Sequence, residues 1–405
     1  MTYDFTTLPD RWDTGAEKYE LMKKRCPDVP RGTVPFSVAD MDFLPPPELS
    51  EGVQDFMRGR VFGYTRTPRE YIAAFQRWMQ RRHGVDIPAA WVVDADSVLG
   101  AMHRMIRAFT RPGDGIVVLT PAYPPFLDAP EPLNRRRLDC PMVLGDDRRY
   151  TIDFALLEDL CRRADTTMLI FCNPHNPMGM LYKKEDLDYL LRLSEKYGFY
   201  IMNDEIWSDM IYPECEFTSL LHFGAERNAR TLTVYGFSKT FGLAGLRIGC
   251  VYTMNQEMYD RVVKASLVDT TIGGIDALSQ IAGEAALKYG FPRVDAFRAQ
   301  IAENRDYALA RIEKMPGIKC HKPQATFVLF PDITGTGWDP VDLIDVLKEK
   351  YRVALVPGGA RFFGPGSEGH IRICLSTSRE VLEEGLNRLE ACLNDIASGK
   401  LNPQK

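Results

Sequence analysis

The chain has 405 residues, of which 45% are hydrophobic and 26% charged, the profile of a globular protein with two domains or one large domain and a smaller one. Its formal net charge of -5 provides no general basic field, so we expect neither a nucleic-acid partner nor binding to an acidic membrane. The nine cysteines and six histidines are dispersed, so we predict free thiols and no metal site.

Residues 1–50 contain several prolines and glycines and little periodicity, and we interpret them as an N-terminal arm or a segment of the smaller domain. Asp40 and Asp42, within VADMDF, are expected to fix the backbone of this arm at the mouth of a pocket. The first residues lack the basic flank and apolar stretch of a signal peptide, and no later run is long enough to cross a membrane. With the free cysteines, this predicts a cytoplasmic protein.

Residues 51–290 alternate between apolar, β-branched runs and helical patterns. Between the apolar runs 167–171 and 199–203, a helical pattern places Leu187, Leu190 and Leu191 on one face. The pattern ends at Gly198, which is suited to cap a helix. This alternation predicts an α/β fold with a mostly parallel sheet covered by helices on both faces. The expected strands are 115–120, 167–171, 199–203 and 231–235.

The pattern changes near Gly290, where we place the start of a smaller C-terminal α+β domain, residues 291–405. Long charged helices flank short apolar runs in this region. The expected elements are helices over 293–314 and 379–396 and strands near 326–330, 353–356 and 370–375.

Polar residues follow three of the predicted strands at their carboxyl ends, where open parallel sheets place functional groups. They are Asn176, Asp204 and the pair Ser238 and Lys239, with Arg247 eight residues further on. Pyridoxal phosphate needs this set, because its aldehyde requires a lysine for a Schiff base and its pyridine nitrogen requires a carboxylate. Asn176 would donate to the ring oxygen, while Ser238 and Arg247 would bind the phosphate.

Other nucleotide, metal and hydrolase motifs are missing from the sequence. The glycines at 242, 245 and 249 do not have the spacing of a dinucleotide fingerprint, and there is no P-loop or HExxH motif. GFSKT departs from a nucleophile elbow at Thr240, where a second glycine is required.

The motifs NPHNPMG (173–179), DEIW (204–207) and SKTFGLAGLRIG (238–249) resemble, in this order, the fold-type I pyridoxal-phosphate enzymes of the aspartate aminotransferase superfamily. VADMDF (38–43) and FGYT (62–65) resemble its MalY/PatB branch of cystathionine β-lyase-like C–S lyases. The resemblance covers nearly the whole chain and implies the fold of that superfamily, with a seven-stranded sheet in the large domain.

The resemblance also implies roles for residues outside the strand ends. Tyr123 would stack on the pyridine ring, and the backbone amides of Gly100, Ala101 and Met102 would bind phosphate. Tyr64 would reach the phosphate of a neighbouring subunit, which implies a homodimer with active sites at the subunit interface. Arg372 would bind the substrate α-carboxylate together with Asn176.

The sequence leaves open which reaction the protein catalyses. The candidate reactions share one step, in which Lys239 removes the Cα proton as general base. VADMDF, FGYT and Gly236 favour a C–S β-lyase that yields thiol, pyruvate and ammonia from an amino acid, whereas Arg247 and the glycine at 242 favour an aminotransferase. Racemization ranks third, and a non-catalytic protein with the same fold is the alternative outside enzymology.

At the position of Trp207 the resemblance implies another residue, commonly Tyr in the aminotransferases and His in the C–S lyases. An indole can donate a hydrogen bond but cannot accept one or carry a charge, so we expect no proton-handling role. We place Trp207 in the substrate pocket, with plain packing in the core as the alternative.

Overall fold

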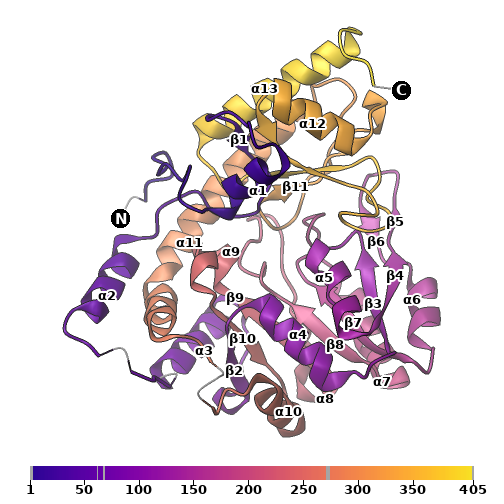
Figure 1. Ribbon diagram of the computed structural model, residues 1–405. Helices are drawn as coiled ribbons and strands as arrows, with labels where there is room; N and C mark the ends of the chain where they lie inside the picture. The colour runs from indigo at the N-terminus through magenta and orange to yellow at the C-terminus, as the bar shows by residue number, and fades with distance from the viewer. Residues whose placement is uncertain (1–2, 62, 67–68, 271–273, 404–405) are drawn as a thin grey trace.

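The computed structural model describes residues 3–61, 63–66, 69–270 and 274–403 (Figure 1). Its helices are α1 (Glu17–Arg25), α2 (Pro47–Met57), α3 (Arg69–His83), α4 (Val98–Phe109), α5 (Pro124–Asp128), α6 (Phe154–Cys161), α7 (Lys184–Tyr197), α8 (Gly224–Arg227), α9 (Phe237–Phe241), α10 (Gln256–Ser266), α11 (Ala277–Ile312), α12 (Pro340–Lys350) and α13 (Arg379–Ala397).

A seven-stranded sheet forms the centre of the molecule, as the sequence predicts. Its strand order is β2-β10-β9-β8-β7-β3-β4. β10 is antiparallel to both of its neighbours, and the remaining pairs are parallel. The strands are β2 (Val92–Ala95), β3 (Gly115–Thr120), β4 (Arg136–Pro141), β7 (Thr166–Cys172), β8 (Tyr200–Asp204), β9 (Thr231–Gly236) and β10 (Gly249–Tyr252). The four predicted strands are confirmed as β3, β7, β8 and β9.

Both faces of this sheet are buried, which explains why its strands read as continuous apolar runs. In β3, Ile116 and Val118 belong to one buried cluster and Val117 and Leu119 to another, because successive side chains of a strand point to opposite faces. Residues of α3, α4 and α10 contribute to the first cluster, and residues of α6 and α7 to the second.

The predicted helix between β7 and β8 is confirmed as α7. Leu187, Leu190 and Leu191 are buried on the face that packs against the sheet. The helix ends at Gly198, whose φ of 78° lies in the left-handed region that glycine adopts without a steric penalty.

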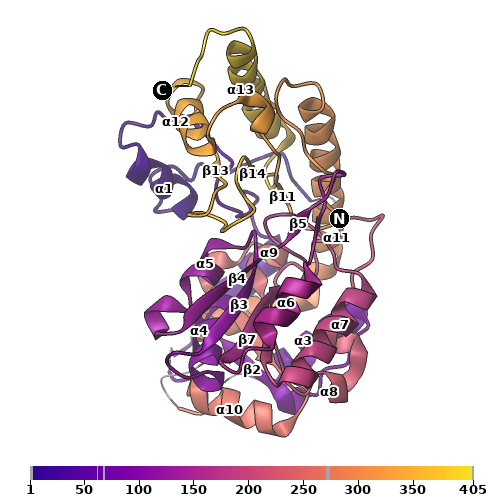
Figure 2. The same cartoon turned by 90° about the vertical axis from the view of Figure 1, so that its right-hand side faces the viewer.

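A second group of elements packs around its own apolar cluster at one end of the molecule. Figures 1 and 2 show α1, α12 and α13 at the end opposite to α8 and α10. The short strands pair as β1 with β12 and as β11-β14-β13, while β5 pairs with β6 elsewhere. They are β1 (Val34–Pro35), β5 (Val143–Leu144), β6 (Tyr150–Thr151), β11 (Val328–Leu329), β12 (Val353–Ala354), β13 (Val356–Pro357) and β14 (Ile371–Cys374).

The 36-residue helix α11 connects the two groups. Its Ile301 packs in the cluster of the central sheet and its Ala308 in the cluster of the second group. The expected domain boundary near Gly290 therefore falls inside a continuous helix, and the division into 1–50, 51–290 and 291–405 stays a prediction. Residues of the N-terminal arm reach both clusters, with Phe36 in the second and Phe43 in the first.

Within the described residues, no helix has the length and apolar character needed to cross a membrane.

Candidate functional site

A cavity of about 460 Å³ lies where β7, β8 and β9 end. These three strands are neighbours in the sheet and parallel, so the residues that follow them meet at one edge. The cavity brings together most of the residues that the sequence analysis selected: Tyr123, Asn176, Asp204, Trp207, Ser238, Lys239, Arg247 and Arg372.

Lys239 lies in the short helix α9, directly after β9. Its Nζ donates a hydrogen bond to the backbone oxygen of Ala39 at 2.6 Å and lies 5.3 Å from the centre of the Trp207 ring. Desolvation lowers the pKa of Lys239 from its ordinary 10.5 to about 8, since burial disfavours the ammonium form. The neutral amine, which a nucleophile or a general base requires, is therefore far more populated near neutral pH than in an ordinary lysine.

Asp204 ends β8 and is 3% exposed. One carboxylate oxygen, Oδ1, accepts the backbone N–H of Ile206 at 2.9 Å, and no cation forms an ion pair with this carboxylate within the described part of the chain. Burial raises the pKa of Asp204 from 3.8 to about 7. The site thus holds a buried carboxylate suited to a positively charged ligand group.

Arg372, in β14, also lines the cavity. Its Nη2 donates to the backbone oxygen of Ser37 at 2.9 Å, and Nη1 lies 3.4 Å from Asn176 Oδ1. The Nε of Arg372 and the Oγ of Ser37 are buried and have no hydrogen-bond partner among the described residues. Unpaired buried donors are costly, so this pair is suited to an oxyanion such as a substrate carboxylate.

The N-terminus of α4, with Ser97 as its N-cap, forms a third side. Ser97, Val98 and Leu99 line the cavity, whereas Gly100, Ala101 and Met102 do not. The N–H of Gly100 donates to Ser97 Oγ at 3.0 Å, and the N–H of Ala101 donates to the backbone oxygen of Ser97, also at 3.0 Å.

The Gly100 and Ala101 amides are thus engaged at the start of the helix, and their role toward a phosphate stays a prediction. Ser97, Val98 and Leu99, which line the cavity, were missed. The sequence does mark this helix start, because a serine directly before the apolar run VLGAM is typical of a helix N-cap. Arg247 lies nearby, with Nη2 at 3.5 Å from Ser97 Oγ. A helix N-terminus, a hydroxyl and a guanidinium together suit a phosphate group.

Trp207 is 1% exposed and lines the cavity beside Lys239. Its ring packs edge-on against Phe327, with centroids 4.6 Å apart. The indole therefore limits the space beside the lysine amine.

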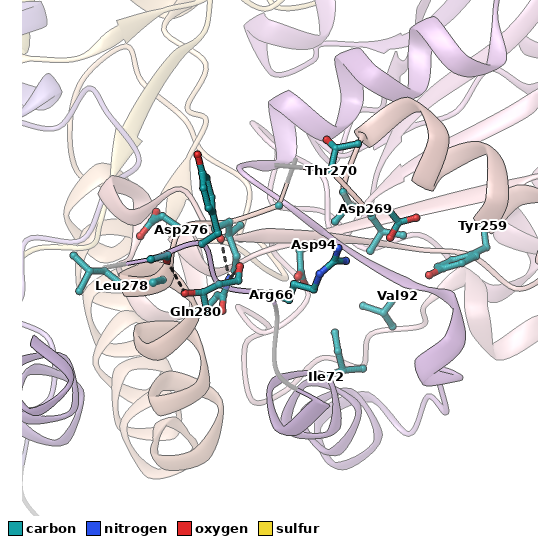
Figure 3. Close-up of a pocket in the computed structure, with 18 residues that line it drawn as sticks. Arg66, Ile72, Val92, Asp94, Tyr259, Asp269, Thr270, Asp276, Leu278 and Gln280 are labelled. Atoms are coloured by element: carbon teal, nitrogen blue, oxygen red, sulfur yellow. Dashed lines mark hydrogen bonds between the residues drawn. The ribbon is translucent and has the colours of Figure 1, made fainter. Parts of the chain in front are cut away.

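Tyr64 is not in this cavity. It is 95% exposed and lies at a separate hollow of about 950 Å³, whose other residues include Arg66, Asp94, Asp269 and Asp276 (Figure 3). Phe62 of the FGYT motif lies outside the described residues. Within one chain, Tyr64 and Lys239 are therefore not brought together.

The N-terminal arm is fixed beside Lys239 by ion pairs, which confirms the structural role expected for Asp40 and Asp42. Asp42 accepts from Lys18 Nζ at 2.7 Å, and Asp40 pairs with Arg11 at 2.7 Å. Lys18 Nζ also donates to the backbone oxygen of Asp40 at 2.9 Å. These contacts hold the adjacent Ala39 carbonyl against the lysine.

A further set of cavity residues was missed because it comes from the arm and from a C-terminal loop, far from the strand ends in sequence. No periodic pattern or motif marks them. They are Glu17, Leu21, Ser37, Val356, Arg361, Phe362 and Phe363. The described residues contain no group of three or more His, Cys, Asp or Glu side chains that could hold a metal ion.

Known proteins are similar to this chain over most of its length. Residues 31–389 match the family model described as aminotransferase class I and II. The cystathionine β-lyase PatB of Bacillus subtilis is 33% identical over 89% of this chain and 92% of its own length. An aspartate aminotransferase of Pyrococcus horikoshii is 28% identical over 89% of this chain and 90% of its own length.

Among solved structures, the chain is similar to cystalysin from Treponema denticola, whose crystal structure contains pyridoxal 5′-phosphate. The two share 32% sequence identity with a TM-score of 0.93, over 98% of this chain and 100% of cystalysin.

Proposed function

The chain belongs to the class I and II aminotransferase family, and on that premise we propose that it is a C–S β-lyase acting on S-substituted L-cysteines. The reaction breaks the Cβ–S bond and consumes one water, giving a thiol, pyruvate and ammonia. The sequence predictions of this superfamily, of its fold and of pyridoxal 5′-phosphate as cofactor are confirmed.

The donor set of the cavity fits this cofactor. Asp204 lacks a cationic partner within the described residues and would pair with a protonated pyridine nitrogen. Asn176 and Tyr123 line the same cavity, where Asn176 would donate to the ring oxygen and Tyr123 would supply an aromatic face. Ser97, Ser238 and Arg247 with the first residues of α4 would hold the phosphate.

When bound, pyridoxal phosphate supplies an aldehyde that takes up the substrate amine and a ring that delocalises negative charge from Cα. The protein supplies Arg372 and Ser37, whose unpaired buried donors would bind and orient the α-carboxylate. Lys239, with its lowered pKa, would remove the Cα proton. The Ala39 carbonyl would hold the Lys239 amine between proton transfers.

The similarity to the named lyases carries the choice of reaction. PatB is named a cystathionine β-lyase and is 33% identical, compared with 28% for the aspartate aminotransferase of Pyrococcus horikoshii. VADMDF, typical of the lyase branch, places its Ala39 carbonyl on the lysine amine. Aminotransfer to a 2-oxo acid is the second candidate, favoured by that aminotransferase relative and by the SKTFGLAGLRIG motif.

The deciding experiment incubates cofactor-loaded protein with L-cystathionine, L-cysteine and other amino acids in the absence of any 2-oxo acid. Pyruvate, ammonia and thiol formed in equal amounts over many turnovers are expected for a β-lyase. Conversion that stops after one equivalent, leaves pyridoxamine phosphate and resumes with a 2-oxo acid would identify an aminotransferase instead.

We also propose that the protein is a homodimer and is located in the cytoplasm. Tyr64 is exposed and remote from Lys239, which supports a role in the site of a second copy rather than in its own. Its hollow (Figure 3) is formed by chain segments near residues 63–66, 92–94, 268–270 and 274–280. All nine cysteines are free thiols, as a reducing compartment favours. Sedimentation analysis tests the homodimer, and cell fractionation tests the location in the cytoplasm.

A further inference from the structure

The cavity continues beyond Arg372 toward two charged side chains of opposite sign. Glu17, at the start of α1, and Arg361, in the loop after β13, both line it and are both exposed. Within the described residues, neither side chain forms a hydrogen bond or an ion pair, so the two charges also do not pair with each other. Both are free to meet a ligand that enters the cavity.

The loop that carries Arg361 is fixed by internal hydrogen bonds. Gly359 N–H donates to Ser367 Oγ at 2.8 Å, and that hydroxyl donates to the Gly364 backbone oxygen at 2.7 Å. Phe363, two residues after Arg361, lies under the Arg372 guanidinium, with Cζ 5.3 Å from the ring centre. Arg372 therefore packs on a ring of the same loop that carries Arg361.

The backbone of Glu17 is also held in place. The next residue, Lys18, is 1% exposed and forms the ion pair with Asp42 described above. This contact anchors the first turn of α1 on the arm, so the Glu17 backbone is fixed while its carboxylate remains in solvent.

The cavity that contains these charges and the lysine is also lined by apolar side chains. They include Leu21, Leu243, Val356 and Phe362. Such a lining suits the methylene and sulfur atoms of a thioether, whereas the two charges suit polar groups at the far end of the substrate.

We propose that Glu17 and Arg361 determine specificity for cysteine S-conjugates whose leaving thiol carries both an ammonium and a carboxylate group. Arg361 binds the distal carboxylate and Glu17 binds the distal ammonium. The inference rests on the proposed lyase function and extends it to the leaving group, which the inner residues Lys239, Asp204 and Arg372 do not contact in this assignment.

Three substrates and two variants test the roles of Arg361 and Glu17 separately. S-(2-carboxyethyl)-L-cysteine carries only a distal carboxylate, S-(2-aminoethyl)-L-cysteine only a distal amine, and S-ethyl-L-cysteine neither. Because exposed ion pairs are modest, Arg361→Gln should lower kcat/KM about fivefold for the carboxyethyl substrate and leave the other two near their wild-type values. Glu17→Gln should do the same for the aminoethyl substrate alone.

Arg162→Gln, at an exposed position in the C-terminal cap of α6, serves as the matched control and should change none of the three values. S-ethyl-L-cysteine turnover and cofactor absorbance show that each variant is folded and loaded. Equal effects on all three substrates, or no effect on either charged substrate, would overturn the specificity assignment while leaving the lyase intact. Absence of pyruvate from all three substrates with wild-type protein would instead overturn the proposed function.

Discussion

The buried carboxylate of Asp204 shows why the site depends on its cofactor. A carboxyl with a pKa raised to about 7 by burial is held as an anion only at a cost to folding. A pyridinium group would supply the missing positive charge, so the cofactor should stabilise the fold as well as enable the reaction.

Replacement of Asp204 by Asn in cofactor-free protein should therefore increase the free energy of unfolding, and the gain should depend on pH. The folded state binds the proton more tightly than the unfolded chain, so the cost of Asp204 is absent below about pH 4, grows with pH and is complete above about pH 7. The gain in the variant should reach roughly 4 kcal/mol at most, from about 1.4 kcal/mol per pKa unit.

Urea unfolding between pH 4 and pH 8 measures this gain. Asp159→Asn, at an exposed site, should show no such pH dependence. A constant difference across the pH range, or a loss of stability at pH 8, would contradict the charge assignment. In the loaded enzyme the same variant should lose most turnover, because the pyridine nitrogen loses its carboxylate.

Trp207 packs between the lysine and Phe327, so its replacement should affect stability as well as the pocket. Trp207→Ala removes a large buried ring and should lower the free energy of unfolding by about 3 kcal/mol, whereas Trp207→Phe should cost about 1 kcal/mol. Denaturant unfolding of the two variants provides the comparison. An alanine variant as stable as wild type would show that the ring is not packed as described.

At the scale of elements, the placement of α9 depends on a buried carboxylate behind it. Asp209 accepts hydrogen bonds from Tyr235 in β9 at 2.5 Å and from Thr240 in α9 at 2.8 Å, and lies 3.1 Å from His83 Nε2 at the end of α3. These bonds hold the pKa of Asp209 at about 2 despite its burial. One side chain thus joins three elements next to Lys239.

Asp209→Ala should lower the free energy of unfolding by about 3–5 kcal/mol, since it leaves several buried polar groups unpaired. The contribution of the carboxylate is present above its unfolded pKa near 3.8 and is lost as the pH falls toward 2. Thermal unfolding at neutral pH tests the loss, with Asp159→Asn as an exposed control that should shift stability by no more than about 0.5 kcal/mol. A similarly small effect for Asp209→Ala would refute the bracing role.

The elements also show what could be predicted from sequence. The strand ends that carry Asn176, Asp204 and Lys239 were predictable, because buried parallel strands are apolar runs and their carboxyl ends share one sheet edge. The short strand β2 and the antiparallel β10 were not, since four residues give too weak a pattern. For the phosphate, the amides of Gly100, Ala101 and Met102 were chosen instead of the first residues of α4, because Ser97 was not recognised as its N-cap.

At the scale of the whole molecule, the side of the cavity formed by the arm and the C-terminal loop could not be predicted from sequence. Glu17 and Arg361 are more than 300 residues apart and carry no motif. Their convergence depends on long-range packing, in which β1 pairs with β12 and α11 connects the two apolar clusters.

The proposed homodimer makes a prediction at this scale. Tyr64→Ala and Lys239→Ala homodimers should each have little activity, but hybrid dimers formed by unfolding and refolding the mixture should regain about a quarter of the wild-type kcat. Half of a random mixture is hybrid, and each hybrid dimer combines both intact residues at one of its two sites. Activity of the mixture that stays at the level of the separate variants would show that Tyr64 does not act across subunits.

The central claim is that Lys239 holds the cofactor. Borohydride reduction of the loaded protein, followed by digestion and peptide mass spectrometry, tests it most directly. We predict a single phosphopyridoxyl group on the peptide that contains Lys239, absent from Lys239→Ala and unchanged in a control such as Lys264→Ala. A label on another lysine, or no label on loaded wild-type protein, would contradict the account of the site.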